Sequence, residues 1–96
     1  MLVSISLNGH KKIRVTKWFE MYYGAEEFKP GKRNHVLYVV HKSENFPGFS
    51  IVIEAGGDDR QGEAAVFKFA DSLPQTVDAS YLKSFAKKQG FTVVEE

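Results

Sequence analysis

The sequence contains no cysteine. Without thiols the chain forms neither a disulfide framework nor a thiolate metal site, and a cysteine nucleophile is excluded. The absence fits a reducing compartment, and we expect the protein to be cytoplasmic. The core must then be held by packing, for which a composition of 43% hydrophobic and 14% aromatic residues is sufficient.

Long hydrophobic runs are also missing. No apolar stretch approaches the roughly 20 residues that a membrane-spanning helix needs. The first seven residues, MLVSISL, alternate and lack a basic start, so they do not resemble a signal peptide. We therefore expect no membrane partner, and the length of 96 residues predicts a single domain over residues 1–96.

Neither sign of charge is in excess over the whole chain. The formal net charge of +1 argues against a dedicated nucleic-acid binder. The charges are nonetheless segregated. Residues 10–42 hold eight Lys or Arg and three Glu, a net of +5, whereas residues 43–80 hold two basic and seven acidic residues, a net of −5. Such a split is either a solvated surface or a polarised surface that matches a charged partner.

Three runs rich in Val, Ile, Phe and Tyr dominate the middle of the chain. They cover residues 34–42, 49–55 and 63–70, and turn residues separate them, which is the pattern of consecutive strands. Alternation in the third run predicts that Phe67 and Phe69 face the core together. The glycine-rich segment before this run then reads as a hairpin loop.

The N-terminal part predicts a further hairpin. Residues 2–7 alternate, an Asn-Gly turn follows, and residues 11–16 form the return strand. In this return strand we expect Ile13 and Val15 to face inward and Arg14 to face outward.

Residues 16–24 carry four large aromatic rings and fit two structures. Thr16 can cap a short helix that Gly24 ends. Equally, the aromatic residues can continue the preceding strand with a bulge, and we favour this strand because apolar residues occupy both parities. Residues 25–34 then read as a loop with a Pro-Gly turn.

Residues 79–89 have the period of a helix. Asp78 is suited to its N-cap, and Gly90 to the left-handed position that ends it. Its apolar face consists of Tyr81, Leu82, Phe85 and Ala86. A short strand over residues 91–94 follows and can pair in parallel after a crossover. The fold class we predict is α+β, with a mainly antiparallel sheet of five to six strands and one C-terminal helix packed on one face.

No catalytic or metal-binding motif is recognisable. His35 and His41 share a face of one predicted strand, but six residues separate them by about 20 Å, so they cannot share an ion. A metal site would need His10 beside a carboxylate. Residues 56–62 are glycine-rich without the pattern of a phosphate or calcium loop, and no serine lies in a nucleophile elbow. We expect no enzyme activity, no cofactor and no bound metal.

Aromatic and basic residues are interleaved between positions 17 and 33. This mixture is typical of single-stranded nucleic-acid binding, where bases stack on rings and phosphates contact cations. It is equally typical of the energetically dominant residues in protein interfaces. The candidate binding residues are Lys17, Trp18, Tyr22, Tyr23, Lys29, Lys32 and Arg33.

A chain this short without catalytic chemistry acts by contact. We therefore expect a stand-alone binding module, an adaptor or inhibitor that occupies the surface of a partner protein. The split charge favours a protein partner over a polyanion. Single-stranded nucleic-acid binding by residues 17–33 is the alternative, and formation of a homodimer through an uncovered strand edge would satisfy the same facts.

Overall fold

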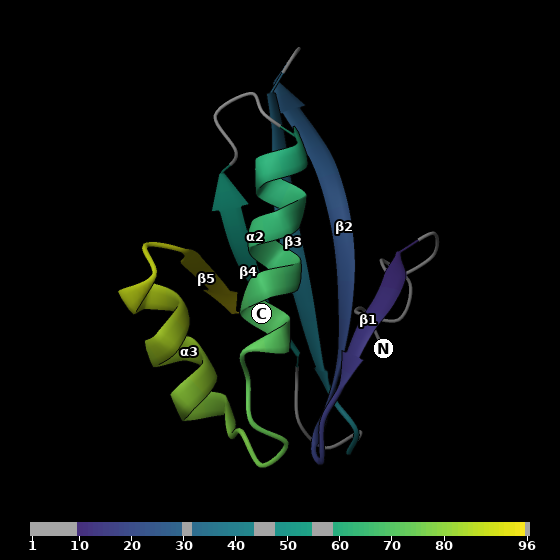
Figure 1. Ribbon diagram of the computed structural model, residues 1–96, viewed down its shortest axis with the longest axis vertical. Coiled ribbons are helices and arrows are strands. Elements are labelled where there is room, and N and C mark those ends of the chain that lie inside the picture. The colour runs from purple at the N-terminus through teal and green to yellow at the C-terminus, as the bar shows by residue number, and fades with distance from the viewer. Residues whose placement is uncertain (1–9, 30–31, 44–47, 55–58, 96) are drawn as a thin grey trace.

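A five-stranded antiparallel sheet forms one layer of the computed structural model, and two helices cover one of its faces (Figure 1). Each strand pairs with the next along the chain, in the order β1-β2-β3-β4-β5. The description covers residues 10–29, 32–43, 48–54 and 59–95, with the backbone alone at 26–29, 32–33, 54 and 59. The protein is a small α+β domain, as predicted, and the described residues hold two helices where one was expected.

The described elements have the following bounds. The strands are β1 (Lys11–Val15), β2 (Phe19–Lys29), β3 (Lys32–His41), β4 (Phe49–Glu54) and β5 (Thr92–Glu95). The helices are α2 (Asp59–Asp71), which follows β4, and α3 (Ala79–Lys88), which precedes β5. No helix in this part of the chain combines the length and apolar character needed to cross a membrane.

The prediction of a strand over residues 63–70 is wrong, because this segment lies within α2. Its buried side chains are Val66, Phe69 and Ala70, and Leu73 beyond the helix end is buried as well. Their spacing of i, i+3, i+4 and i+7 is helical, and alanine and charged residues on the remaining positions favour a helix. The loop expected over residues 56–62 is also wrong from Asp59 onward, because α2 begins at this residue.

Phe67 does not share the core with Phe69, contrary to expectation. Phe69 is 4% exposed, whereas Phe67 is only half-buried and packs its ring 5.5 Å from the ring of Tyr23. The two phenylalanines are two positions apart, which is the same face of a strand but nearly opposite faces of a helix.

The parallel pairing expected for the last strand is also wrong, because β5 pairs with β4 antiparallel. Two helices connect β4 to β5 instead of one. In Figure 1, α2 runs back from the end of β4, and α3 returns before β5 descends beside β4. The second helix thus reverses the direction in which the chain enters the final strand.

A bulge in β1 reverses the orientation predicted for its last residues. The register with β2 shifts between Lys12 and Arg14, so that Ile13 has no counterpart on β2. After this extra residue, Arg14 lies opposite the buried Met21 on the helix-covered face, and Val15 is 43% exposed. The alternation argument failed because one inserted residue shifts all later side chains to the other face.

β2 and β3 form a long hairpin where residues 25–34 were expected to be a loop. The strand that we favoured over a helix continues through Gly24, which is buried in the sheet. A Cβ atom at Gly24 would approach Cδ2 of His10 to 2.0 Å, so the histidine ring occupies the place of a side chain. His10 also packs edge-on against Tyr38, with ring centroids 4.7 Å apart.

The hydrophobic core lies between the sheet and α2. Leu37 and Val39 of the central strand β3 are fully buried, as are Met21 on β2 and Ile51 on β4. From the helix side they are covered by the apolar face of α2 described above. Burial of this face is the main source of stability for the fold.

α3 begins and ends as its sequence predicts. The Asp78 Oδ1 accepts a hydrogen bond from the Tyr81 N–H (2.7 Å), and Gly90 has a φ of 85° after the helix end. Leu82 and Ala86 are buried. Tyr81 is 51% exposed, so its expected place in the core is wrong: it lies at the edge of the apolar stripe and stacks on Phe85.

Arg14 connects β1 to the C-terminal end of α2. Its guanidinium donates hydrogen bonds to the carbonyl oxygens of Ala70 (3.2 Å), Asp71 (3.2 Å) and Leu73 (2.6 Å). The last carbonyls of a helix lack intrahelical partners and carry the negative end of the helix dipole. The Arg14 guanidinium on β1 therefore supplies hydrogen-bond donors to carbonyl groups at the C-terminal end of α2, the helix that covers the sheet.

Some predicted features lie outside the described residues. They are the strand over residues 2–7, its Asn-Gly turn, the Pro-Gly turn at 30–31 and most of the turn at 43–48.

Phenylalanine truncation tests the helical assignment of α2. We expect Phe69→Ala to lower the free energy of unfolding by about 3–5 kcal/mol, and Phe67→Ala to lower it by about 1–2 kcal/mol, because only Phe69 is fully enclosed. Urea unfolding followed by circular dichroism measures both. Equal losses would indicate a strand, in which the two rings share one face.

Replacement of Arg14 tests its role at the end of α2. We expect Arg14→Met to cost about 1–3 kcal/mol, since three carbonyls lose a charged donor. Arg14→Lys should recover only part of the loss, because one ammonium group cannot reproduce the guanidinium fork. Lys11→Met removes the same charge from an exposed position on the same strand and serves as the control. The role is refuted if Arg14→Met and Lys11→Met unfold at the same urea concentration.

Candidate functional site

Trp18 lies in the tight turn that connects β1 to β2. The backbone of this turn is fixed, because the Thr16 N–H donates to the Phe19 carbonyl (2.9 Å) and the Phe19 N–H donates to Thr16 Oγ1 (3.3 Å). The Lys17 N–H donates to the Gln75 carbonyl (2.9 Å), which attaches the turn to the segment before α3. These hydrogen bonds thus fix the backbone of the turn from which the Trp18 side chain projects.

An apolar hollow of about 260 Å³ opens beside this tryptophan. We call it the Trp18 hollow; its lining consists of Trp18, Phe19, His41, Asp78 and Ala79. Trp18 keeps 37% of its surface exposed, whereas Phe19 beneath it is buried. The hollow therefore has a hydrophobic floor and an accessible aromatic wall.

A cation lies close to the Trp18 ring at the edge of the hollow. The Lys17 Nζ lies 5.2 Å from the centroid of the Trp18 ring, a cation–π arrangement. The Lys42 N–H donates to the Trp18 carbonyl (2.8 Å), and the Lys42 side chain is exposed. The Lys17 ammonium thus lies beside the indole, so a partner that buries Trp18 meets positive charge there.

Two potentially catalytic groups line this hollow, and both are engaged in structural hydrogen bonds. His41 accepts at Nδ1 from the Ser43 N–H (3.0 Å), and its ring packs edge-on against Phe19 at 5.1 Å. Asp78 accepts from the first turn of α3, as described above. The arrangement suits the burial of an apolar group better than acid–base chemistry, which needs an acid or base aimed at a reacting atom.

Tyr22 does not join Trp18 in one surface. It lies on the sheet face opposite the helices, where its hydroxyl donates to Glu20 Oε1 (2.9 Å). Lys12 Nζ lies 2.9 Å from the same carboxylate and 5.6 Å from the Tyr22 ring. The phenol is therefore already part of a local cluster of Lys12, Glu20 and Tyr22.

The contacts within this cluster shift the pKa values of all three side chains. The hydrogen bond from Lys12, followed by that from Tyr22, lowers the pKa of Glu20 below its usual 4.5. The same contact with Glu20 raises the pKa of Lys12. Burial, and then the hydrogen bond to Glu20, raises the pKa of Tyr22.

Tyr23 lies on the helix-covered face, as strand alternation requires. Its hydroxyl is 2.6 Å from Nδ1 of the buried His35, and its ring packs against His35 and Phe67. The residue is half-buried beneath α2 and packs against the core. Tyr22 and Tyr23 thus face opposite sides of one strand, so the segment offers no continuous aromatic surface.

The basic residues Lys29, Lys32 and Arg33 belong to the far end of the β2–β3 hairpin. Lys29 lies opposite Lys32 in the strand register, ten residues along β2 from Phe19. At about 3.3 Å per residue, this end is about 33 Å from the turn that carries Trp18. The side chains of the three basic residues lie outside the described part of the structure.

The histidines do not assemble a metal site with carboxylates in the described residues. No three His, Asp or Glu side chains in this part of the chain come together as ligands. His35 is enclosed on the helix side of the sheet, and His10 packs on Gly24 and Tyr38.

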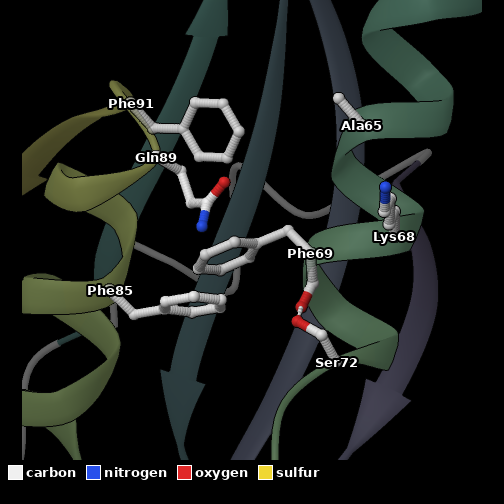
Figure 2. A pocket seen from close by; sticks show the side chains of 7 residues that line it. All are labelled: Ala65, Lys68, Phe69, Ser72, Phe85, Gln89 and Phe91. Carbon is white, nitrogen blue, oxygen red and sulfur yellow. Dashed lines mark hydrogen bonds between the residues drawn. The ribbon is translucent and has the colours of Figure 1, made fainter.

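A second hollow, also of about 260 Å³, lies between α2 and α3. We call it the inter-helix groove; Figure 2 shows it lined by Lys68, Phe69, Ser72, Phe85, Gln89 and Phe91, with Ala65 higher on α2. The Phe69 and Phe85 rings stack with centroids 5.1 Å apart, and Phe91 meets Phe69 edge-on at 5.6 Å. Three rings from both sides thus form a hydrophobic floor.

The groove was missed in the sequence because α2 was expected to be a strand. The signal that identifies it is the helical spacing of buried residues over α2, which places Phe69 toward α3. Once both helices are assigned, Phe69 and Phe85 each lie on an apolar stripe that faces the other helix. Lys68 and Gln89 follow as neighbours of these rings on the exposed side.

Comparison with known proteins supplies no relative. The chain matches no protein-family model, no curated protein and no solved structure. The Trp18 hollow and the inter-helix groove are therefore the features of the molecule from which its function can be inferred.

The low pKa of Glu20 predicts how stability depends on pH. A carboxylate whose pKa is lower in the folded than in the unfolded state stabilises the fold at pH values above its unfolded-state pKa. This contribution is lost as the pH falls through the folded-state pKa. We expect Glu20→Gln to be less stable than wild type at pH 7 and equal to it at pH 2. Urea unfolding at both pH values measures this, and a pH-independent difference would contradict it.

Proposed function

We propose that this protein is a non-catalytic protein-binding module, an adaptor or inhibitor that acts by covering a partner's surface, with Trp18 at the centre of the contact. The observation that carries the proposal is an accessible tryptophan, held by a fixed turn, beside an apolar hollow. Tryptophan is among the residues that dominate binding energy when a partner encloses it. A cytoplasmic setting is part of the proposal, since the cysteine-free composition favours it.

The rigid turn supports binding for an entropic reason. Association loses free energy when flexible side chains and loops must be ordered. Because four hydrogen bonds already fix the backbone around Trp18, little backbone ordering remains to be done on this side of the interface. The Trp18 hollow offers space for an apolar side chain of the partner, and Lys17 beside the indole favours a partner that is acidic nearby.

Single-stranded nucleic-acid binding by residues 17–33 is the weaker alternative. It requires several rings on one surface with cations along the same path. Tyr22 and Tyr23 face opposite sides of the sheet, and the remaining basic residues belong to the distant end of the hairpin. This geometry favours a protein partner over an extended nucleic-acid strand.

A homodimer through a strand edge is also less favoured. Among the described strands, β1 and β5 have a neighbour on one side. β5 is four residues long and ends in Glu95, which pairs with Lys83 of α3. A short edge strand with a charged side chain is the form in which proteins protect an edge against pairing.

Substitution of Trp18 tests the proposal. Wild-type protein is used to isolate partners from nuclease-treated native lysate, and the purified partner is then titrated against each variant by calorimetry. We expect Trp18→Ala to weaken binding by at least about 2 kcal/mol, a thirty-fold loss, because the indole fills the centre of the contact.

Val94→Ala is the matched control. Val94 is an apolar residue of similar exposure (49%) that lies on the sheet face opposite the helices. Its truncation to alanine should leave the affinity for the partner unchanged. Thermal unfolding of each variant shows that the fold is retained. Unchanged affinity in Trp18→Ala, or capture that depends on nucleic acid, would overturn the proposal.

A further inference from the structure

We propose that the inter-helix groove binds an aromatic side chain from an acidic peptide segment of a partner protein. The inference rests on the proposed protein-binding function and names a second contact surface together with the chemistry of what it binds.

The size and lining of the groove fit one aromatic ring. A dry apolar cavity of about 150 Å³ is sufficient to bind benzene. The groove encloses about 260 Å³, which leaves room for a ring and the start of its side chain. Phe69 presents 4% of its surface, but Phe85 and Phe91 are half-buried, so their rings are available to a ligand.

The arrangement of the rings favours an aromatic over an aliphatic guest. Phe69 and Phe85 stack nearly parallel, with an angle of 18°, and Phe91 meets Phe69 at 71°. A further ring that packs on the accessible sides of Phe85 and Phe91 can extend the same stacked and edge-on contacts, which add to the effect of area burial. Gln89 also lines the groove (Figure 2), and its amide can bond to a peptide backbone.

The groove continues along α3, which points to a peptide rather than a small molecule. A smaller hollow of about 130 Å³ is lined by Tyr81, Ser84, Phe85 and Lys88. Phe85 lines both hollows, so a chain anchored in the larger one can cross Phe85 to reach the other. Tyr81, which is half exposed and stacks on Phe85, would contact this second part of the chain.

The charges around the groove select an acidic segment. Lys68 lines the larger hollow and Lys88 the smaller, and no carboxylate is among the described residues that line either. α3 carries three lysines and no acid between Ala79 and Lys88. Lys83 pairs with Glu95, whereas Lys68 and Lys88 are exposed at the groove and can contact carboxylates of a partner.

Direct titration with a defined probe tests the inference. The probe is a fluorescein-labelled synthetic peptide with one phenylalanine flanked by glutamates, followed by fluorescence anisotropy with the full chain. We expect saturable binding that weakens about ten-fold when the phenylalanine becomes alanine, or when the glutamates become glutamines. Labelled oligothymidylate is the nucleic-acid probe and should bind more weakly than the acidic peptide.

Matched charge variants locate the binding site. Lys68→Glu should weaken peptide binding about ten-fold, and Lys68→Arg should retain it. Lys42→Glu makes the same change in net charge at an exposed residue that does not line the groove, and it should alter affinity less than two-fold. Phe85→Leu, which keeps the groove apolar but removes the stacked ring, should weaken the phenylalanine peptide more than a leucine version of it.

Each outcome separates this inference from the proposed function. Equal effects of Lys68→Glu and Lys42→Glu, or tighter binding of oligothymidylate than of the peptide, would overturn the inference. So would a Trp18-dependent partner whose affinity is unchanged by Lys68→Glu and Phe85→Leu, although the proposed function would then stand. Groove-dependent peptide binding without any Trp18-dependent partner supports the inference and contradicts Trp18 as the main contact.

Discussion

The burial of one sheet face beneath α2 is the interaction on which the rest of the structure depends. Leu37 and Val39 on the central strand have no exposure, and Val66 and Phe69 of α2 enclose them from the helix side. A sheet with one uncovered apolar face would lose most of its hydrophobic stabilisation. Arg14 contributes to the same interaction, because it binds the carbonyls at the end of α2 and joins the helix to the strand at the sheet edge.

The position of α3 against this core in turn determines the two surfaces that we associate with binding. α3 is anchored by Leu82 and Ala86, and described contacts between the helices are made by the rings of Phe69, Phe85 and Phe91. Contact through ring faces leaves space between the helices, and this space is the inter-helix groove. The Trp18 hollow lies at the other end of the same helix, where Asp78 and Ala79 begin α3. Both surfaces therefore follow from how one helix is placed.

Strand geometry also explains why the aromatic and basic residues between positions 17 and 33 do not form one shared binding surface. Alternation divides neighbouring tyrosines between two faces, and extension separates Trp18 from Lys29 by the length of β2. Residues that are adjacent in sequence are thus dispersed in space. Conversely, Phe69 and Phe91 are far apart in sequence and meet because a helix and a short loop bring them together.

The sequence by itself determined the local features: the class of the fold, β3 and β4, the caps of α3 and the choice of strand over helix after Thr16. Each depends on residues a few positions apart, whose backbone preferences act without the rest of the chain. The tertiary structure alone decided the helical state of residues 59–71, the bulge at Ile13, the antiparallel direction of β5 and the exposure of Tyr81. A segment such as AAVFKFA fits either period, and only the sheet face that needs a cover selects the helix. The candidate site divides in the same way: Trp18 was identifiable as an aromatic among cations, whereas the inter-helix groove exists only where α2 and α3 meet.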